Sequence, residues 1–315
     1  MKVLFVHFPF NNDEVEGKEL PKYFASRGHE VHSIFRKDVR KFTSKYYQNG
    51  IIEQIPEECL LTNYDLLVCK SSSYQTYGKN FLGSKTFVVN ITPMGLSNNL
   101  KNIDYAFDIS QLIKPPVQEM RDALTDYLPW EKRKNQIVIA ASIGSDKNQI
   151  EFVKFFDPKA FPDYSILFLG TIVSQNYAND LISILKNKKV NFSFDNVDRK
   201  TLGKIFMESK FSALTTDPRP GQPYDPSPRV VFESISAGTP CILSDLVRVH
   251  EGSKQFSFFY ENQNLKSFES MTKRVMESDL SKISRESYDY GIREYNLENA
   301  CKKAYEDIIK AMNAI

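Results

Sequence analysis

Cysteine is scarce in this sequence, and its placement argues against a disulfide-stabilised fold. The 315 residues include four cysteines, Cys59, Cys69, Cys241 and Cys301, which show no paired spacing. Cys69 and Cys241 lie inside apolar runs, where a thiol packs as a small hydrophobic group. We therefore expect four reduced thiols and a cytoplasmic protein, because disulfides are rare in that compartment.

An excess of charge and long apolar runs are also lacking. The chain has 41 Lys and Arg against 39 Asp and Glu, a net charge of +2, so no basic field indicates nucleic-acid binding. No apolar run approaches the roughly 18 residues that span a bilayer. The apolar start turns acidic at Asp13 without a cleavage signature, which favours a first strand over a signal peptide. A membrane surface or a polyanionic acceptor stays open.

Patterns that hold metal ions are missing as well. Two aspartates separated by one residue occur nowhere in the chain. The four histidines form no convincing set, since His29 and His32 straddle the start of a predicted strand and would point to opposite faces. The sequence therefore predicts neither a metal nor another cofactor.

The length and the order of apolar runs indicate a two-domain α/β protein. A chain of this length exceeds the usual limit of about 250 to 300 residues for one core. Short apolar runs alternate with helix-like stretches, a pattern typical of parallel sheets covered by helices. The predicted strands are residues 2–8, 30–35, 65–70 and 86–92 in the first half, and 136–142, 165–170, 189–194, 211–215 and 240–244 in the second.

A polar, proline-marked stretch at 128–134 suggests a domain boundary. We expect a first domain at 1–131 and a second at 132–296. The remaining residues, 297–315, place apolar side chains on one face of a predicted helix: Leu297, Ala300, Cys301, Ala304, Tyr305, Ile308, Ile309 and Met312.

Residues 225–245 form the most informative segment. Ser227 can cap free backbone N–H groups, and Pro228 suits the first helical position, so a helix should begin there. Gly238 should end it, because a left-handed terminal residue suits glycine best. Residues 240–244 then form an apolar, strand-like run. The segment therefore predicts a short helix flanked by strands.

Two charged residues share one face of this predicted helix. Arg229 and Glu233 lie four residues apart. A helix N-terminus attracts anions, and a neighbouring arginine would strengthen a phosphate site. Glu233, one turn further, could accept hydrogen bonds from a ribose diol. The alternative is an ordinary surface ion pair of about 0.3 to 0.5 kcal/mol.

The same segment resembles group 1 retaining glycosyltransferases, which have the two-lobed GT-B fold. Asp225 and Glu233 are spaced like the paired carboxylates of that family, and Ser-Ala-Gly-Thr-Pro-Cys-Ile-Leu-Ser-Asp resembles its glutamate helix and next strand. Asp225 stands where a glutamate is usual. Pro-Ser-Pro-Arg-Val-Val-Phe-Glu is also similar to exostosin-type glycosyltransferases. The resemblance implies two Rossmann-like lobes with parallel sheets facing a central cleft, and a terminal helix that packs back on the first lobe.

A donor site follows from this resemblance. Lys147, in the loop with Gly144 and Ser145, resembles the family lysine that contacts the donor diphosphate; the alternative is an exposed loop lysine. An arginine is usual five residues earlier, where this chain has Ser142. The positive charge of that arginine would have to come from another residue. The implied donor site comprises Gly144, Ser145, Lys147, Arg219, Tyr224, Asp225, Ser227, Arg229 and Glu233, with Arg229 or Arg219 replacing the missing charge.

Candidates for a catalytic base lie near the end of the first predicted strand. His7 can point into the cleft and act as a general base, although a histidine at a strand end is more often a packing or hydrogen-bonding residue. Asp13, Glu14 and Glu16 follow in the next loop and are comparable candidates if the reaction inverts the sugar. A retaining reaction like that of group 1 needs no dedicated base.

The sequence thus predicts a metal-independent glycosyltransferase, either a hexosyl- or a pentosyltransferase. It would move a sugar from a nucleotide-diphosphate donor, its co-substrate, to a glycan, lipid or other hydroxyl acceptor. Two alternatives stay open, a nucleotide-sugar epimerase of the same fold and a catalytically silent two-lobed nucleotide-sugar-binding protein.

Overall fold

The chain divides into two compact units in the computed structural model. Unit 1 comprises Met1–Lys114 and Leu297–Ile315, and unit 2 comprises Pro115–Asn296. The division follows Lys114, whereas the sequence analysis placed a boundary after residue 131. The structure describes residues 1–7, 19–38, 41–48, 51–55, 64–70, 87–92, 105–108, 120, 124, 126–217, 224–226, 228–295 and 297–314. None of the helices in these ranges is both long and apolar enough to cross a membrane.

Unit 1 is built on a seven-stranded sheet in the order β4-β3-β2-β1-β5-β6-β7. Five strands run parallel, and β3 and β4 extend one edge in antiparallel fashion. The four strands predicted in this half are confirmed as β1, β2, β5 and β6. The strand bounds are β1 Lys2–His7, β2 Glu30–Asp38, β3 Lys41–Gln48, β4 Ile51–Ile55, β5 Leu66–Lys70, β6 Phe87–Thr92 and β7 Tyr105–Asp108.

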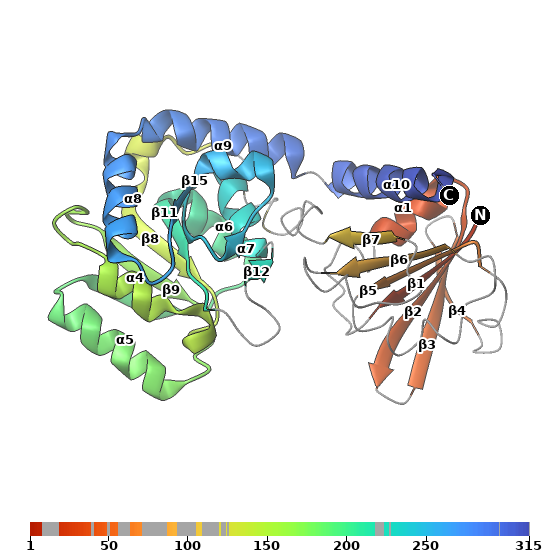
Figure 1. Ribbon diagram of the computed structural model, residues 1–315, viewed down its shortest axis with the longest axis horizontal. Helices are drawn as coiled ribbons and strands as arrows, with labels where there is room; N and C mark the ends of the chain where they lie inside the picture. Colours follow the sequence, from red (N-terminus) through yellow and green to blue (C-terminus); the bar gives the residue numbers. More distant parts are fainter. Residues whose placement is uncertain are drawn as a thin grey trace. The chain divides into compact units, whose positions relative to one another are not determined.

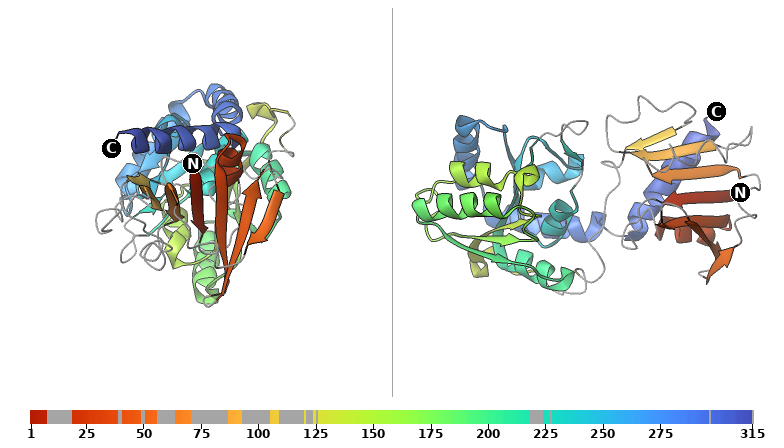
Figure 2. Two further views of the ribbon diagram at one scale, coloured as in Figure 1. Left: turned by 90° about the vertical axis from the view of Figure 1, so that its right-hand side faces the viewer. Right: turned by 90° about the horizontal axis from the view of Figure 1, so that it is seen from below.

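Helix α1 (Leu20–Ser26) and helix α10 (Leu297–Asn313) pack together on this sheet (Figure 1). The Tyr305 ring lies 4.8 Å from the Phe24 ring, and its hydroxyl lies 3.0 Å from His29 Nε2. The apolar face expected for the last helix is the face that joins the core, with Cys301, Ala304 and Ile308 buried. Figure 2 shows α10 lying along one side of the strands. The end of the chain thus completes the core of unit 1.

Unit 2 contains a six-stranded, wholly parallel sheet in the order β10-β9-β8-β11-β13-β15. Numbered within the unit, this is the strand order 3-2-1-4-5-6 of dinucleotide-binding domains. The five strands predicted for this half are confirmed, and β15 was not foreseen. The strands are β8 Lys134–Ala140, β9 Ser165–Leu169, β10 Asn191–Asp195, β11 Ser209–Leu214, β13 Cys241–Ser244 and β15 Ser257–Tyr260, with β12 Asp225–Pro226 and β14 Val247–Arg248 forming a separate pair.

Helices cover both faces of the second sheet because side chains alternate along each strand. Ile137 and Ile139 of β8 face the core formed with α4, α5 and α8, while Val138 joins the core formed with α6 and α7. Figure 1 shows these two groups of helices on opposite sides of the strands. The helices are α4 Gln149–Phe155, α5 Gln175–Asn187, α6 Arg199–Glu208, α7 Arg229–Ser236, α8 Leu265–Glu277 and α9 Leu280–Glu294, with short 3-10 turns at Trp130–Lys132, Ser145–Lys147 and Glu251–Phe256.

The polar stretch expected to link two domains instead contributes a buried arginine to unit 2. Arg133 is 4% exposed and donates to the carbonyl oxygens of Ala237 and Gly238, at 3.1 and 2.9 Å. These carbonyls belong to the end of α7, where the helix dipole favours a cation. Burial lowers the pKa of Arg133 to about 10, which still leaves it charged at neutral pH. The stretch therefore anchors α7 rather than separating domains.

Candidate functional site

A cavity of about 440 Å³ lies at the carboxyl ends of the unit 2 strands. The strand order changes direction at β8, because β9 and β10 lie on one side of it and β11, β13 and β15 on the other. Ligands of such sheets bind in the crevice at this switch point. Residues at the ends of β8, β9 and β11 line the cavity together with the starts of α6 and α7: Ala140, Ala141, Ser142, Lys147, Leu169, Gly170, Asn196, Val197, Arg199, Leu202, Leu214, Asp225, Pro228, Arg229 and Val230.

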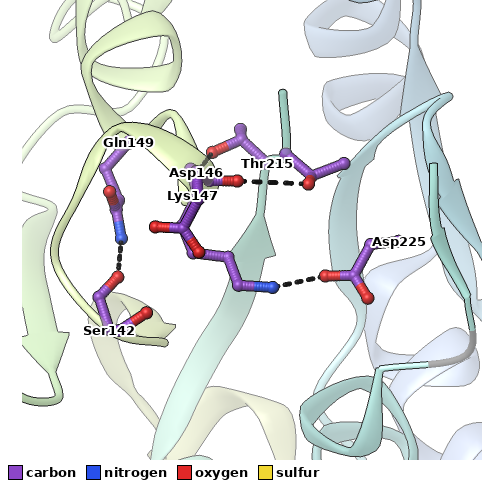
Figure 3. A network of polar contacts seen from close by, with 7 residues as sticks. Ser142, Asp146, Lys147, Gln149, Thr215 and Asp225 are labelled. Atoms are coloured by element: carbon purple, nitrogen blue, oxygen red, sulfur yellow. Dashed lines mark hydrogen bonds and ion pairs between the residues drawn. The ribbon is translucent and has the colours of Figure 1, made fainter. Parts of the chain in front are cut away.

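Lys147 reaches the cavity from a tight turn that follows β8. Its N–H donates to the carbonyl of Gly144 at 3.1 Å, and the backbone of Asn148 is left-handed, with φ of 42°. The Lys147 ammonium pairs with the carboxylate of Asp225, with 2.5 Å between Nζ and Oδ2 (Figure 3). The structure thus brings two predicted donor-site residues together. Gly144 and Ser145 form the turn itself and do not line the cavity.

Side chains from other segments fix this turn. The Thr215 hydroxyl donates to the carbonyl of Lys147, and Gln149 Nε2 donates to the carbonyl of Ser142 at 2.7 Å (Figure 3). Thr215 follows β11, so the turn is tied to the neighbouring strand. Ser142, which stands where the family resemblance expects an arginine, lines the cavity and adds no charge.

Asp225 lies in a short strand pair, and Tyr224 precedes it. The Asp225 N–H donates to the carbonyl of Leu246 at 2.8 Å, and its side chain is 13% exposed. The Tyr224 ring lies against the guanidinium of Arg248, with 5.3 Å between Cζ and the ring centroid. Tyr224 is not among the residues that line the cavity. Of these two predicted residues, only Asp225 reaches it.

Helix α7 begins one residue later than the sequence analysis placed it. Pro228 occupies the capping position, with φ of −66° and ψ of 131°, and its carbonyl accepts from the N–H of Val231 at 3.1 Å. Arg229 is the first helical residue and lines the cavity. The helix ends as predicted, because Gly238 follows it with φ of 71°.

Glu233 is fully buried on α7 and pairs with an arginine that sequence reasoning missed. Arg199, the first residue of α6, donates through Nη1 to both carboxylate oxygens, at 2.7 and 3.0 Å. Burial raises the pKa of the Glu233 carboxyl, while the charges of Arg199 and Arg229 oppose that rise. No hydrogen bond joins Arg229 to Glu233 in the described part of the chain, so the surface pair named as the alternative is not formed, and Glu233 instead bonds to a residue of another helix. Arg199 lies 34 residues from Glu233, and only folding brings them together.

The charges around the cavity favour an anion. Lys147, Arg199 and Arg229 line it, and the carboxylate of Asp225 is the one acidic group among its described lining residues. Both α6 and α7 begin at the cavity, and helix N-termini attract anions through free N–H groups and the helix dipole. No three His, Cys, Asp or Glu side chains gather into a metal-binding group within the described residues.

Several predicted residues cannot be placed at this site. His7 is the last residue of β1 and is aligned with Phe35 of β2, and only its backbone is described. The other predicted residues that lie outside the described ranges are Asp13, Glu14, Glu16, Arg219 and Ser227. The catalytic residues therefore stay predictions.

Comparison with known proteins identifies the fold. No protein-family model and no curated protein sequence matches the chain. Among solved structures, a glycosyltransferase from Rickettsia africae superposes with a TM-score of 0.62 at 14% identity, covering 99% of this chain and 98% of the other. An α-glucosyltransferase in complex with UDP and DNA superposes with a TM-score of 0.56 at 15% identity, covering 98% of this chain and 99% of the other. Anabaena HepE, in complex with UDP and glucose, superposes with a TM-score of 0.57 at 11% identity, covering 98% of this chain and 100% of the other. The chain therefore has the fold of GT-B glycosyltransferases.

Proposed function

We propose that this protein is a glycosyltransferase that moves a sugar from a nucleotide-diphosphate donor to an acceptor hydroxyl. The observation that carries the proposal is the cavity at the strand reversal of unit 2, lined by Lys147, Arg199 and Arg229. The likeness to the structures that contain UDP supports a nucleotide there. An acceptor would be a glycan, a lipid or another hydroxyl compound.

The cations suit the chemistry of sugar transfer. As the bond between the sugar C1 and the diphosphate oxygen breaks, its electron pair moves onto the diphosphate. The acceptor hydroxyl oxygen bonds to C1, and its proton passes to a base such as the departing diphosphate or water. Positive groups fixed at the leaving diphosphate stabilise the charge that develops there. Lys147 and Arg229 provide such groups, and we therefore propose a reaction that uses protein cations at the diphosphate rather than a metal ion.

Asp225 has a second role in this proposal. In the described structure it neutralises Lys147 across 2.5 Å. A bound diphosphate would compete for the same ammonium, so donor binding should loosen this ion pair. The freed carboxylate would then accept hydrogen bonds from the hydroxyls of the transferred sugar.

A thermal-shift screen tests the proposal. The protein is heated with UDP, GDP, ADP and CMP sugars, each well above its expected dissociation constant. A ligand present at one hundred times that constant adds about 2.7 kcal/mol of stability. We expect a shift with at least one donor, reduced in Lys147→Ala and retained in Lys204→Ala, which changes an exposed lysine of α6 outside the cavity. No shift with any donor would overturn the proposal.

Product analysis then separates transfer from the alternatives. A transferase releases the nucleoside diphosphate and requires an acceptor. An epimerase changes the donor sugar without an acceptor, and a silent binding protein leaves the donor intact. Incubation of the stabilising donor with and without candidate acceptors, followed by chromatography, distinguishes the three outcomes.

A further inference from the structure

Arg199 and Glu233 form one ion pair, yet they meet the cavity differently. The Arg199 side chain is 42% exposed and lines the cavity, whereas the Glu233 side chain is 0% exposed and is not part of the lining. A ligand that enters the cavity therefore contacts the guanidinium before it can reach the carboxylate. This order of contact matters for a ribose diol, the ligand expected for Glu233 from the sequence.

The hydrogen bonds of Arg199 leave one edge of its guanidinium available. Nη1 donates to both oxygens of Glu233, at 2.7 and 3.0 Å. Among the described residues, neither Nε nor Nη2 of Arg199 has a hydrogen-bond partner. A guanidinium has five N–H groups in a fixed plane, and Nε–H and one Nη2–H are parallel along one edge. Two parallel N–H groups match two oxygens of a phosphate.

The position of Arg199 in the fold supports a role in binding. A cation at the first residue of a helix opposes the helix dipole, which favours negative charge there. The start of α6 is already capped by Asp198, whose carboxylate accepts from the N–H of Thr201 at 2.7 Å. Arg199 is therefore not needed to begin the helix. The negative charge of buried Glu233 offsets the unfavourable position of Arg199 at the helix start and fixes the orientation of the Arg199 guanidinium plane.

We infer that Arg199 contacts the phosphates of the nucleotide donor and that Glu233 positions its guanidinium instead of binding the ribose. This inference rests on the proposed function and assigns residues within the same site. Arg199 supplies the positive charge that is missing at Ser142, and it comes from a different helix. Together with Lys147 it forms a diphosphate site with cations from two separate segments.

Binding measurements with ligands of increasing phosphate content test this assignment. Isothermal titration calorimetry is performed with pyrophosphate, UDP and uridine on the wild type, Arg199→Ala, Arg199→Lys and the control Lys204→Ala. We expect Arg199→Ala to weaken pyrophosphate and UDP about 10- to 100-fold and to leave uridine unchanged. Arg199→Lys should restore part of the affinity because it keeps the charge but not the planar edge. Lys204→Ala should match the wild type.

A double-mutant cycle with Glu233→Gln separates positioning from direct contact. If Glu233 acts only through Arg199, Glu233→Gln weakens UDP in the wild type and has no effect in the Arg199→Ala background. The double variant also avoids leaving a buried carboxylate without its partner, so it tests the site where Arg199→Ala alone unfolds. In addition, the preference for UDP over 2′-deoxy-UDP should be the same in Glu233→Gln and the wild type.

Three results would overturn the inference. They are unchanged pyrophosphate affinity in folded Arg199 variants, a loss of the preference for UDP over 2′-deoxy-UDP in Glu233→Gln, and failure of the wild type to bind pyrophosphate. The proposed function is tested by a different measurement, because it is rejected only if no nucleotide sugar stabilises the protein. If a nucleotide sugar stabilises the protein but Arg199→Ala binds pyrophosphate as tightly as the wild type, the proposed function stands and the phosphate-binding role of Arg199 is rejected.

Discussion

Lys147 and Asp225 lie 78 residues apart in the chain and form an ion pair in the cavity wall, with 2.5 Å between Nζ and Oδ2. Both side chains are largely buried, at 22% and 13% exposure. An ion pair with so little access to water is less screened than a surface pair. The ion pair therefore neutralises the lysine, and an anion that binds must compete with Asp225.

Removal of Asp225 should strengthen anion binding. In Asp225→Asn, Lys147 loses its competing carboxylate and the cavity gains one unit of positive charge. We expect pyrophosphate to bind about 3- to 10-fold more tightly, equivalent to roughly 0.7 to 1.4 kcal/mol. Calorimetric titration measures the change, with Asp180→Asn on the exposed side of α5 as a control for the same change in net charge. Weaker pyrophosphate binding would contradict competition between the two anions.

Removal of Lys147 should have the opposite effect. We expect Lys147→Ala to weaken pyrophosphate at least about 10-fold, because a charge-assisted hydrogen bond is worth about 1.5 to 3 kcal/mol. The same variant leaves Asp225 without its partner, which adds repulsion toward an anion. The double variant Lys147→Ala, Asp225→Asn should therefore recover part of the lost affinity. No recovery would show that the two charges act independently on the ligand.

Part of this site could be predicted from the sequence, because some signals are local. Arg229 and Gly238 follow from helix-start and helix-end chemistry within one short segment, whereas Lys147 was assigned by its resemblance to a family lysine. Arg199 could not be assigned in the same way. It precedes Glu233 by 34 residues on another helix, and its own neighbours in sequence are polar and unremarkable. Only the packing of α6 against α7 brings the pair together.

The fold could also be predicted in part, because buried strands leave a local signal in the sequence. Strands buried on both faces appear as apolar runs, and all nine predicted runs are strands. The antiparallel strands β3 and β4, of which β4 is the edge strand, lack such a continuous run, as in Lys-Phe-Thr-Ser-Lys-Tyr-Tyr-Gln of β3. The domain boundary predicted at 128–134 was wrong because a polar, proline-marked stretch resembles a linker, and the sequence does not show that Arg133 is buried.

The buried Arg133 should be important for stability. It donates to the carbonyls of Leu128, Ala237 and Gly238 and to the hydroxyl of Thr239. Arg133→Met keeps much of the side-chain volume but removes the donor to all four acceptors, of which the Gly238 carbonyl keeps a hydrogen bond from the Ser284 hydroxyl. We expect a loss of about 3 kcal/mol or more in the free energy of unfolding, measured by urea denaturation. Arg285→Met, at an exposed position on α9, is the matched control and should cost well under 1 kcal/mol. Equal losses would contradict the anchoring role.

The Cys241 thiol should resist alkylation in the folded protein. Burial raises its pKa from 9.0 to about 11, so the reactive thiolate is absent near pH 8. The folded state keeps a proton that the unfolded state loses, and its contribution to stability should decline as the pH rises from about 9 to 11. Iodoacetamide labelling at pH 8 with mass spectrometry should modify Cys241 slowly in buffer and rapidly in 8 M urea. Rapid labelling in buffer would contradict its burial.

Gly170 should tolerate no side chain. A comparison with Gly28 separates the cost of the steric clash from the cost of the backbone conformation. Both have positive φ, at 154° and 82°, which L residues rarely adopt. A Cβ at Gly170 would lie 2.3 Å from the carbonyl oxygen of Ala141, whereas one at Gly28 would have nothing within 4 Å. Gly28→Ala therefore carries only the backbone cost, about 1 to 2 kcal/mol.

For Gly170→Ala, the clash adds to the backbone cost, and we expect a total of about 3 kcal/mol or more in urea denaturation. Gly170 and Ala141 both line the cavity at the ends of β9 and β8. The shift needed to relieve the clash should therefore also weaken pyrophosphate binding, which Gly28→Ala should leave unchanged because Gly28 is not among the residues that line the cavity. A Gly170→Ala protein with the stability of Gly28→Ala and full affinity would show that the close approach of these two strand ends is not required for the cavity.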